Sequence, residues 1–226
     1  PDKNVFIASP NGYPDKDYKA LAERLINGFP EAKYIDISGL LSADDFYYTD
    51  SHWRQEKILT VADEIADKMG AERIGQCEKH DAGVSFYGVY YGQAALPHAP
   101  ERFFYLDNAV IRGLKVYNVE TSSDIPVYDL GAAAGRDPYE MFLGGARSII
   151  RITNPNTAKK RRLIVFRDSF GSSIAPLIAA GYSEITLVDI RYISPSSLGK
   201  LIDFTKTDDA LFLYSASVIN NSETIK

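Results

Sequence analysis

Ser169 is the residue of this sequence best placed to act as a nucleophile. It follows an apolar run at residues 163–166, which predicts a short buried strand, and it precedes a helical segment at residues 173–180. A strand–turn–helix connection would lift the serine hydroxyl above the end of a sheet, while the helix N-terminus offers unpaired N–H groups to an oxyanion. The same pattern is also typical of a strand that ends in a polar turn and caps the next helix.

His52 is the candidate general base. It lies at the junction of a loop and a helix, two residues after Asp50. An imidazole acts as a base when a carboxylate holds its second ring nitrogen, and Asp50 could do this, or could instead cap the helix that follows. The other histidines, His80 and His98, lie in polar loops and are interpreted as surface residues. Asp50, His52 and Ser169 therefore form a candidate catalytic triad, since triads are defined by geometry rather than by chain order.

A metal site is the alternative for the same part of the chain. Its ligands would be Asp50, His52, Asp168 and Asp189, but this set offers only one nitrogen ligand and has no recognisable spacing. We expect Asp168 to shape the turn before Ser169 rather than to take part in chemistry. The sequence therefore favours serine chemistry that needs no metal and no other cofactor.

The elements that must position these residues alternate between strands and helices at both ends of the chain. Apolar runs predict strands at residues 4–8, 33–37, 148–152, 163–166, 184–190 and 210–214. Helical spacing predicts helices at residues 16–27, 58–69 and 173–180 and after Ser194-Pro195, and turns are expected at residues 11–12 and 14–15. This alternation predicts an α/β domain with a mainly parallel sheet.

Residues 83–128 follow a different pattern. Short runs rich in aromatic and β-branched residues are separated there by glycines and prolines, which predicts antiparallel β structure. We expect a β-rich lobe inserted beside the main sheet of a single domain spanning residues 1–226. Tyrosines in this lobe are candidate platforms for a glycan or another polar ligand, although tyrosine is equally common in strands: Tyr87, Tyr90, Tyr91 and Tyr105.

Composition restricts the class of protein. The chain has 226 residues, of which 45% are hydrophobic, enough for one sizeable core with an inserted lobe. The net charge of −5 argues against nucleic-acid binding, and the single cysteine, Cys77, cannot form an internal disulfide. No apolar run reaches membrane-spanning length. The sequence begins at Pro1 without a signal peptide, as a processed or excised chain would, and a membrane anchor outside it stays open.

Four motifs, in order along nearly the whole chain, resemble those of the DHHW family of bacterial proteins. The first is Tyr-Tyr-Thr-Asp-Ser-His-Trp at residues 47–53, and the second is Tyr-Glu-Met-Phe-Leu-Gly-Gly at residues 139–145. The third is Phe-Arg-Asp-Ser-Phe at residues 166–170, and the fourth is Leu-Val-Asp-Ile-Arg-Tyr at residues 187–192. Four motifs in the right order are far more specific than any one of them.

This family is similar to the circularly permuted SGNH-hydrolase-like domains of alginate O-acetylation proteins. The resemblance implies a flavodoxin-like α/β sandwich with Ser169 as nucleophile, His52 as base and Asp50 as its orienter. The backbone N–H of Ser169 and the Gly144-Gly145 turn would form the oxyanion hole. It further implies O-acetyl chemistry on an extracellular or envelope polysaccharide, as a serine esterase or O-acetyltransferase. Its partners would be that glycan and an acetyl donor, and its location extracellular or in the cell envelope.

The sequence departs from the family pattern at three positions. Residue 51 is a serine where the family name implies a second histidine, but it lies between the two triad candidates. Ala146 follows Gly144-Gly145 where an asparagine is expected, which would remove one oxyanion donor. Arg167 replaces the usual Gly or Lys, which we interpret as neutral. A non-catalytic envelope protein of the same fold, binding glycan or a protein partner, is therefore the alternative function.

Overall fold

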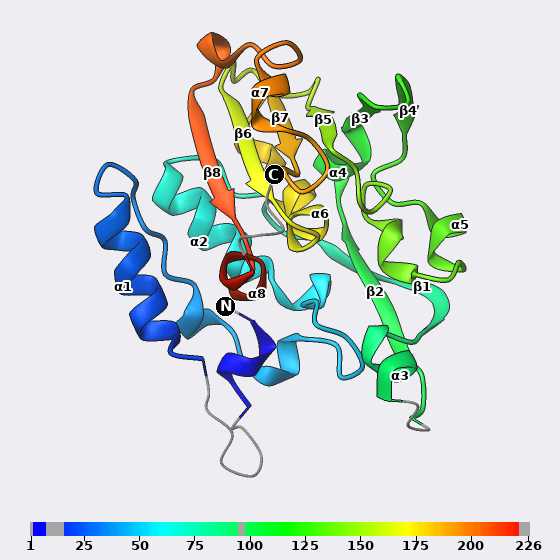
Figure 1. The fold of residues 1–226 in the computed structure, drawn as a ribbon. Coiled ribbons are helices and arrows are strands. Elements are labelled where there is room, and N and C mark those ends of the chain that lie inside the picture. Colours follow the sequence, from blue (N-terminus) through cyan, green and yellow to red (C-terminus); the bar gives the residue numbers. More distant parts are fainter. Residues whose placement is uncertain (1, 8–15, 95–97, 222–226) are drawn as a thin grey trace.

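A six-stranded mixed sheet forms the centre of the molecule in a computed structural model that describes residues 2–7, 16–94 and 98–221 (Figure 1). The strand order is β4-β3-β5-β7-β6-β8. The bounds are Lys115–Asn118 for β3, Ser123–Ile125 for β4, Ile149–Thr153 for β5, Arg162–Arg167 for β6, Glu184–Val188 for β7 and Asp209–Leu213 for β8.

The prediction of a mainly parallel sheet is wrong. β6 runs parallel to β7 and β8, whereas β3 is antiparallel to both β4 and β5, and β5 is antiparallel to β7. β3 and β4 are joined by a short turn, which allows only antiparallel pairing. The parallel part of the sheet is therefore confined to the three strands around β6.

Helices and short 3₁₀ segments connect and cover these strands. The α-helices are α1 (Tyr18–Gly28), α2 (Leu59–Met69), α3 (Val89–Ala94), α4 (Ala109–Gly113), α5 (Leu130–Ala133), α6 (Phe170–Ile174), α7 (Pro195–Leu198) and α8 (Ala216–Asn220). The 3₁₀ segments are Lys3–Val5, Ser38–Leu40, Ala43–Asp45, Gln55–Lys57, Pro138–Met141, Ala175–Gly181 and Phe204–Lys206. The predicted helices at residues 16–27 and 58–69 are confirmed. The helix predicted at 173–180 instead begins earlier as α6 and continues as a 3₁₀ segment, in which Pro176 cannot donate an α-helical hydrogen bond.

Two predicted strands near the N-terminus are wrong. Residues 3–5 form a 3₁₀ turn, and residues 33–37 have no regular structure. Lys3 accounts for the first case, because its buried ammonium group donates to the carbonyl oxygens of Tyr47 and Tyr48 and ties the segment to a loop. Ile35 and Ile37 pack against the core without pairing to a strand. Residue 8 and the turns expected at residues 11–12 and 14–15 lie outside the described residues.

The inserted lobe is smaller than expected. It consists of an antiparallel pair, β1 (Glu78–Phe86) and β2 (Glu101–Asp107), with α3 between them (Figure 1). β3 and β4, which were expected in the lobe, extend the main sheet instead. The lobe therefore begins before residue 83 and ends near residue 107 rather than at 128.

Three apolar clusters hold the layers together. The largest cluster packs α2 and the segment after β6 against one face of the main sheet. It also includes Trp53 and, from the lobe, Leu106. A second, rich in aromatic residues, lies between the lobe and the segment Pro138–Met141. A third covers the other face of the sheet with Leu198 and Ile202. No helix in the described part of the chain is long and apolar enough to cross a membrane.

Candidate active site

Ser169 lies directly after the carboxyl end of β6, at the start of α6. The turn is fixed by the buried Asp168, whose carboxylate accepts hydrogen bonds from the N–H groups of Phe170 (3.0 Å) and Ser215 (2.7 Å). Asp168 thus shapes the turn, as expected. The Ser169 side chain makes no capping hydrogen bond to the helix, so its hydroxyl is free to point elsewhere.

That hydroxyl points at His52. Ser169 Oγ lies 2.6 Å from His52 Nε2, and His52 Nδ1 lies 2.6 Å from Asp50 Oδ1. The structure thus brings together three side chains from two segments of the chain, and His52 and Ser169 are 117 residues apart in the sequence. With Nδ1–H donating to Asp50, Nε2 is left as the acceptor for the serine proton.

Asp50 is buried and fully hydrogen-bonded. Its Oδ1 also accepts the N–H of His52 (2.9 Å), and its Oδ2 accepts the N–H of Val89 at the start of α3 (2.9 Å). Burial alone would raise the pKa of Asp50, but the hydrogen bonds from His52 and Val89 and the nearby imidazole outweigh it and lower the pKa below its ordinary value. Asp50 is therefore ionised at neutral pH and suited to orient the imidazole.

The His52 ring is held between two aromatic rings. Tyr139 stacks on it with a centroid distance of 3.9 Å and an interplanar angle of 16°, and Phe170 packs at 5.0 Å on a tilted plane. The hydroxyl of Tyr139 donates to Ser173 Oγ (2.7 Å), which also accepts the indole N–H of Trp53 (2.8 Å). Sequence reasoning placed Tyr139 in a motif but gave it no role, because its contact with His52 is purely tertiary.

The expected oxyanion donors differ in availability. The N–H of Ser169 donates to no group in the described part of the chain. Gly144 and Gly145 both have left-handed backbone angles, but the N–H of Gly145 already donates to the carbonyl oxygen of Phe142 (3.1 Å). The N–H groups of Ser169 and Gly144 are therefore the remaining candidates, and the exposed Ala146 adds no side-chain donor.

Arg167, interpreted from the sequence as a neutral replacement, is fully buried. Its guanidinium lies 3.8 Å from the buried Asp189 and donates to the carbonyl oxygens of Gly145 (3.4 Å) and Arg147 (3.5 Å). Arg191 forms a bidentate ion pair with the same Asp189. Arg167 thus links the strand before Ser169 to the glycine turn.

A metal centre is not supported by the geometry. Asp189 is paired with two arginines, and Asp168 accepts two backbone N–H groups. Within residues 2–7, 16–94 and 98–221, no three His, Cys, Asp or Glu side chains are grouped as metal ligands would be. Of the four residues considered as metal ligands, Asp50 and His52 therefore belong to the hydrogen-bonded line that ends at Ser169, Asp168 shapes the turn, and Asp189 is held in ion pairs with two arginines.

The four candidate tyrosines lie in different surroundings. Tyr87 and Tyr91 are exposed and pack against each other at 4.7 Å. Tyr90 is partly buried and lines a small cavity of about 60 Å³ beside Ser51 and Phe170, the neighbours of His52 and Ser169. Tyr105 of β2 packs between His80 of β1 and Tyr128, which lies outside the lobe. Only Tyr90 thus lies next to the Ser169 constellation, whereas Tyr105 serves packing.

Comparison with known proteins shows similarity in fold. No protein-family model and no curated protein matches the sequence. A DHHW family protein from Eubacterium siraeum is 19% identical, with a TM-score of 0.74 over 99% of this chain and 78% of that chain. PatB1 of Bacillus cereus is 16% identical, with a TM-score of 0.65 over 97% of this chain and 81% of that chain. The structure of PatB1 with a sulfonyl adduct is 18% identical, with a TM-score of 0.62 over 88% of this chain and 74% of that chain. The chain therefore shares its fold with a DHHW family protein and with PatB1.

Proposed function

We propose that this chain is a serine-dependent esterase or O-acetyltransferase that acts on acetyl esters of an extracellular or envelope polysaccharide. The observation that carries the proposal is the unbroken hydrogen-bonded line from Asp50 through His52 to Ser169, with 2.6 Å at both steps. Distances in this range suit a nucleophile that passes its proton to a base. The fold shared with a DHHW family protein supports the same assignment.

The proposed reaction has two steps. Ser169 Oγ attacks the acetyl carbonyl carbon while His52 Nε2 takes the serine proton, and the carbonyl oxygen becomes an oxyanion within reach of the free Ser169 N–H. The protonated His52 then gives its proton to the departing sugar oxygen, which leaves acetyl-Ser169. Water or a second sugar hydroxyl attacks this ester, His52 takes the attacking proton and returns it to Ser169, and acetate or an acetylated sugar departs.

The partners of the proposed reaction are a polysaccharide or oligosaccharide and an acetyl donor, which places the protein outside the cell or in its envelope. The exposed rings of Tyr87 and Tyr91 and the half-buried ring of Tyr90 support a glycan-binding wall, because sugar rings pack on aromatic faces. Tyr105 does not contribute to this wall.

A non-catalytic protein of the same fold is the second candidate. Two observations favour it: Ala146 supplies no amide donor, and the N–H of Gly145 is occupied by Phe142. An oxyanion hole with fewer donors stabilises the transition state less, by about 10²–10³ in rate for each donor lost. In that case the chain would bind glycan or a protein partner without turning over acetyl esters.

Trapping of the acyl-enzyme distinguishes the two candidates. The protein is incubated with a small activated acetyl ester, and its intact mass is measured with and without Ser169→Ala and His52→Ala. We expect one added acetyl group on Ser169 of the wild type and none on either variant. A sulfonyl fluoride is a second probe, motivated by the sulfonyl adduct described for PatB1. Equal labelling of wild type and Ser169→Ala by both probes would exclude the proposed nucleophile.

A panel of oligosaccharide acceptors then separates hydrolysis from transfer. Free acetate from every mixture, without acetylated sugar, would identify a hydrolase. Acetylated sugar would identify a transferase, because a well-positioned acceptor can outcompete water through an effective molarity of roughly 10⁵ M or more. Neither product, from a protein that folds normally, would favour the non-catalytic candidate.

A further inference from the structure

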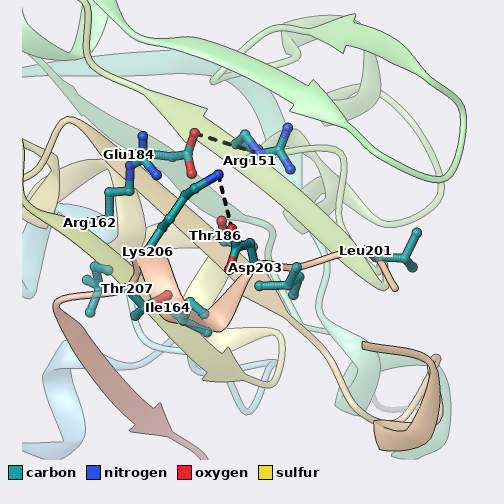
Figure 2. A pocket seen from close by; sticks show the side chains of 11 residues that line it. Arg151, Arg162, Ile164, Glu184, Thr186, Leu201, Asp203, Lys206 and Thr207 are labelled. Atoms are coloured by element: carbon teal, nitrogen blue, oxygen red, sulfur yellow. Dashed lines mark ion pairs between the residues drawn. The ribbon is translucent and has the colours of Figure 1, made fainter. Parts of the chain in front are cut away.

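A second cavity lies at the opposite end of β6 from Ser169. Arg162, the first residue of β6, lines it, whereas Ser169 lies two residues beyond Arg167, the last residue of that strand. Its volume is about 260 Å³. The sheet forms one wall, and residues 201–207 form the other (Figure 2).

The sheet wall is built from two neighbouring rows of side chains. Thr186 of β7 pairs with Arg151 of β5 and with Ile164 of β6, and Glu184 of β7 pairs with Arg162 of β6. Directly opposed residues on paired strands project from the same face, and so do residues two apart on one strand. Strand register therefore places both arginines and Thr186 on one surface, as Figure 2 shows.

Three hydrogen-bond donors of this surface are available to a ligand. The Nε–H of Arg151 is buried and makes no hydrogen bond, although Glu184 Oε2 lies 3.8 Å from it. Thr186, which is 5% exposed, lines the cavity and its side chain makes no hydrogen bond to the described residues. The guanidinium of Arg162 pairs with no carboxylate in the described part of the chain. Since buried polar groups are nearly always hydrogen-bonded, donors that converge on one cavity point to a ligand rich in acceptors.

The charges around the cavity favour an anion. Its lining contains three basic residues and two acidic ones. Both acids already face a cation: Glu184 lies 3.8 Å from Arg151, and Asp203 lies 3.0 Å from Lys206, as marked in Figure 2. The positive charge of Arg162 is left without compensation.

We propose that this cavity is a binding site for an oxyanion group, a carboxylate or a phosphate, with Arg162, Arg151 and Thr186 as donors. Guanidinium groups bind such planar or tetrahedral oxyanions through paired hydrogen bonds. The anion is either a free small molecule or the acidic group of a sugar unit, and both sources offer the same chemistry to the three donors. The site does not depend on the chemistry proposed for Ser169.

Calorimetric titration at low ionic strength tests the site, with inorganic phosphate as one probe and an oligosaccharide containing uronic acid as the other. Saturable binding is expected for at least one probe, in the wild type and equally in Ser169→Ala. Phosphate alone would indicate a free anion, and the oligosaccharide alone would indicate an acidic glycan. Added salt should weaken the binding, because the interaction is between charges.

Four variants locate the binding. Arg162→Gln should weaken it about tenfold or more, and Thr186→Val, which keeps the shape of the side chain, should also weaken it. Glu184→Gln should tighten it by removing a neighbouring negative charge. Arg24→Gln, which removes the same charge from the exposed helix α1, is the matched control and should leave it unchanged. Absence of saturable binding by both probes, or equal affinity of wild type and Arg162→Gln, would overturn the proposal.

Discussion

Tyr139 fixes the orientation of the imidazole without reaching the reacting atoms. Its ring lies flat on His52 at 3.9 Å, and its hydroxyl is anchored on Ser173. A base must be held in a narrow range of positions to be effective, and a displacement of about 1 Å can cost about 10²-fold in rate. We therefore expect the ring of Tyr139 to hold the imidazole in place.

Two replacements of Tyr139 should therefore distinguish the contribution of its ring from that of its hydroxyl. Tyr139→Leu is expected to lower kcat for a small acetyl ester by about 10²-fold with little change in KM, because the imidazole loses its stacking partner. Tyr139→Phe should retain most of the activity, since the ring remains and Ser173 still accepts from Trp53. Steady-state kinetics on variants with native circular dichroism provide the measurement. Equal losses in the two variants would assign the effect to the hydroxyl.

The ionisation of Asp50 links the site to stability. Its pKa in the folded protein is below its ordinary value of 3.8, so its contribution is complete above that pH and is lost as the pH falls through the lower folded value. Asp50→Asn should lower the free energy of unfolding near pH 7 by about 1–3 kcal/mol, as hydrogen bonds to a charged group are lost. The difference from wild type should shrink below about pH 3.8.

Urea unfolding at several pH values measures this dependence. The exposed Asp44, which makes no hydrogen bond or ion pair with the described residues, gives the control variant Asp44→Asn, for which little change is expected at any pH. A destabilisation by Asp50→Asn that is the same near pH 7 and near pH 3 would show that the carboxylate charge contributes nothing.

At the scale of elements, the lobe positions Asp50 through its backbone. The N–H of Gly88 donates to the side-chain hydroxyl of Thr49, and the N–H of Tyr90 donates to the carbonyl oxygen of Thr49. Between them, the N–H of Val89 donates to the carboxylate of Asp50. The connection between β1 and α3 thus lies directly against the loop that carries Asp50. The lobe is part of the support for the candidate triad, whether or not its tyrosines bind glycan.

This contact predicts that Gly88→Ala is damaging. A Cβ atom at Gly88 would overlap the carbonyl oxygen of Thr49 and the Cβ of Asp50, so the loop would have to move and His52 would lose its orienter. We expect kcat for the acetyl ester to fall about tenfold or more. Gly92→Ala, in the neighbouring helix α3, meets no atom within 4 Å and should keep wild-type activity. Equal activity of both variants would show that the loop tolerates the displacement.

At the scale of the whole molecule, the lobe and the main sheet share one core. Leu106 of β2 and Ile111 of α4 belong to the same apolar cluster as Val61 of α2 and Leu163 and Val165 of β6. Units that share a core are expected to unfold together rather than in sequence. The inserted lobe therefore should not behave as an independent domain.

Trp53 allows this cooperativity to be measured. It is the single tryptophan of the chain and is 2% exposed within the shared core. Urea transitions followed by its fluorescence and by far-ultraviolet circular dichroism should coincide in midpoint and slope. Fluorescence that changes well before the helical signal would indicate that the core around Trp53 opens separately.

Features that depend on neighbouring residues could be predicted from the sequence. The Asp-x-His spacing, the strand–turn–helix at Ser169, the helices α1 and α2 and the left-handed end of α2 at Gly70 all follow from patterns a few residues long. The four motifs indicated the resemblance to the DHHW family, and the fold shared with a DHHW family protein agrees with it.

Features that depend on contacts between distant residues could not be predicted in this way and are seen only in the folded chain. The direction of β3 and β5, the absence of a strand at residues 4–7 and the packing of Tyr105 follow from partners far along the chain. The stacking of Tyr139 on His52 and the position of the arginines beside Thr186 could not be predicted for the same reason. Ring stacking and strand register bring together residues that no local sequence pattern relates. An apolar run has the same period in a paired strand and in a packed loop, so only the available neighbours distinguish the two.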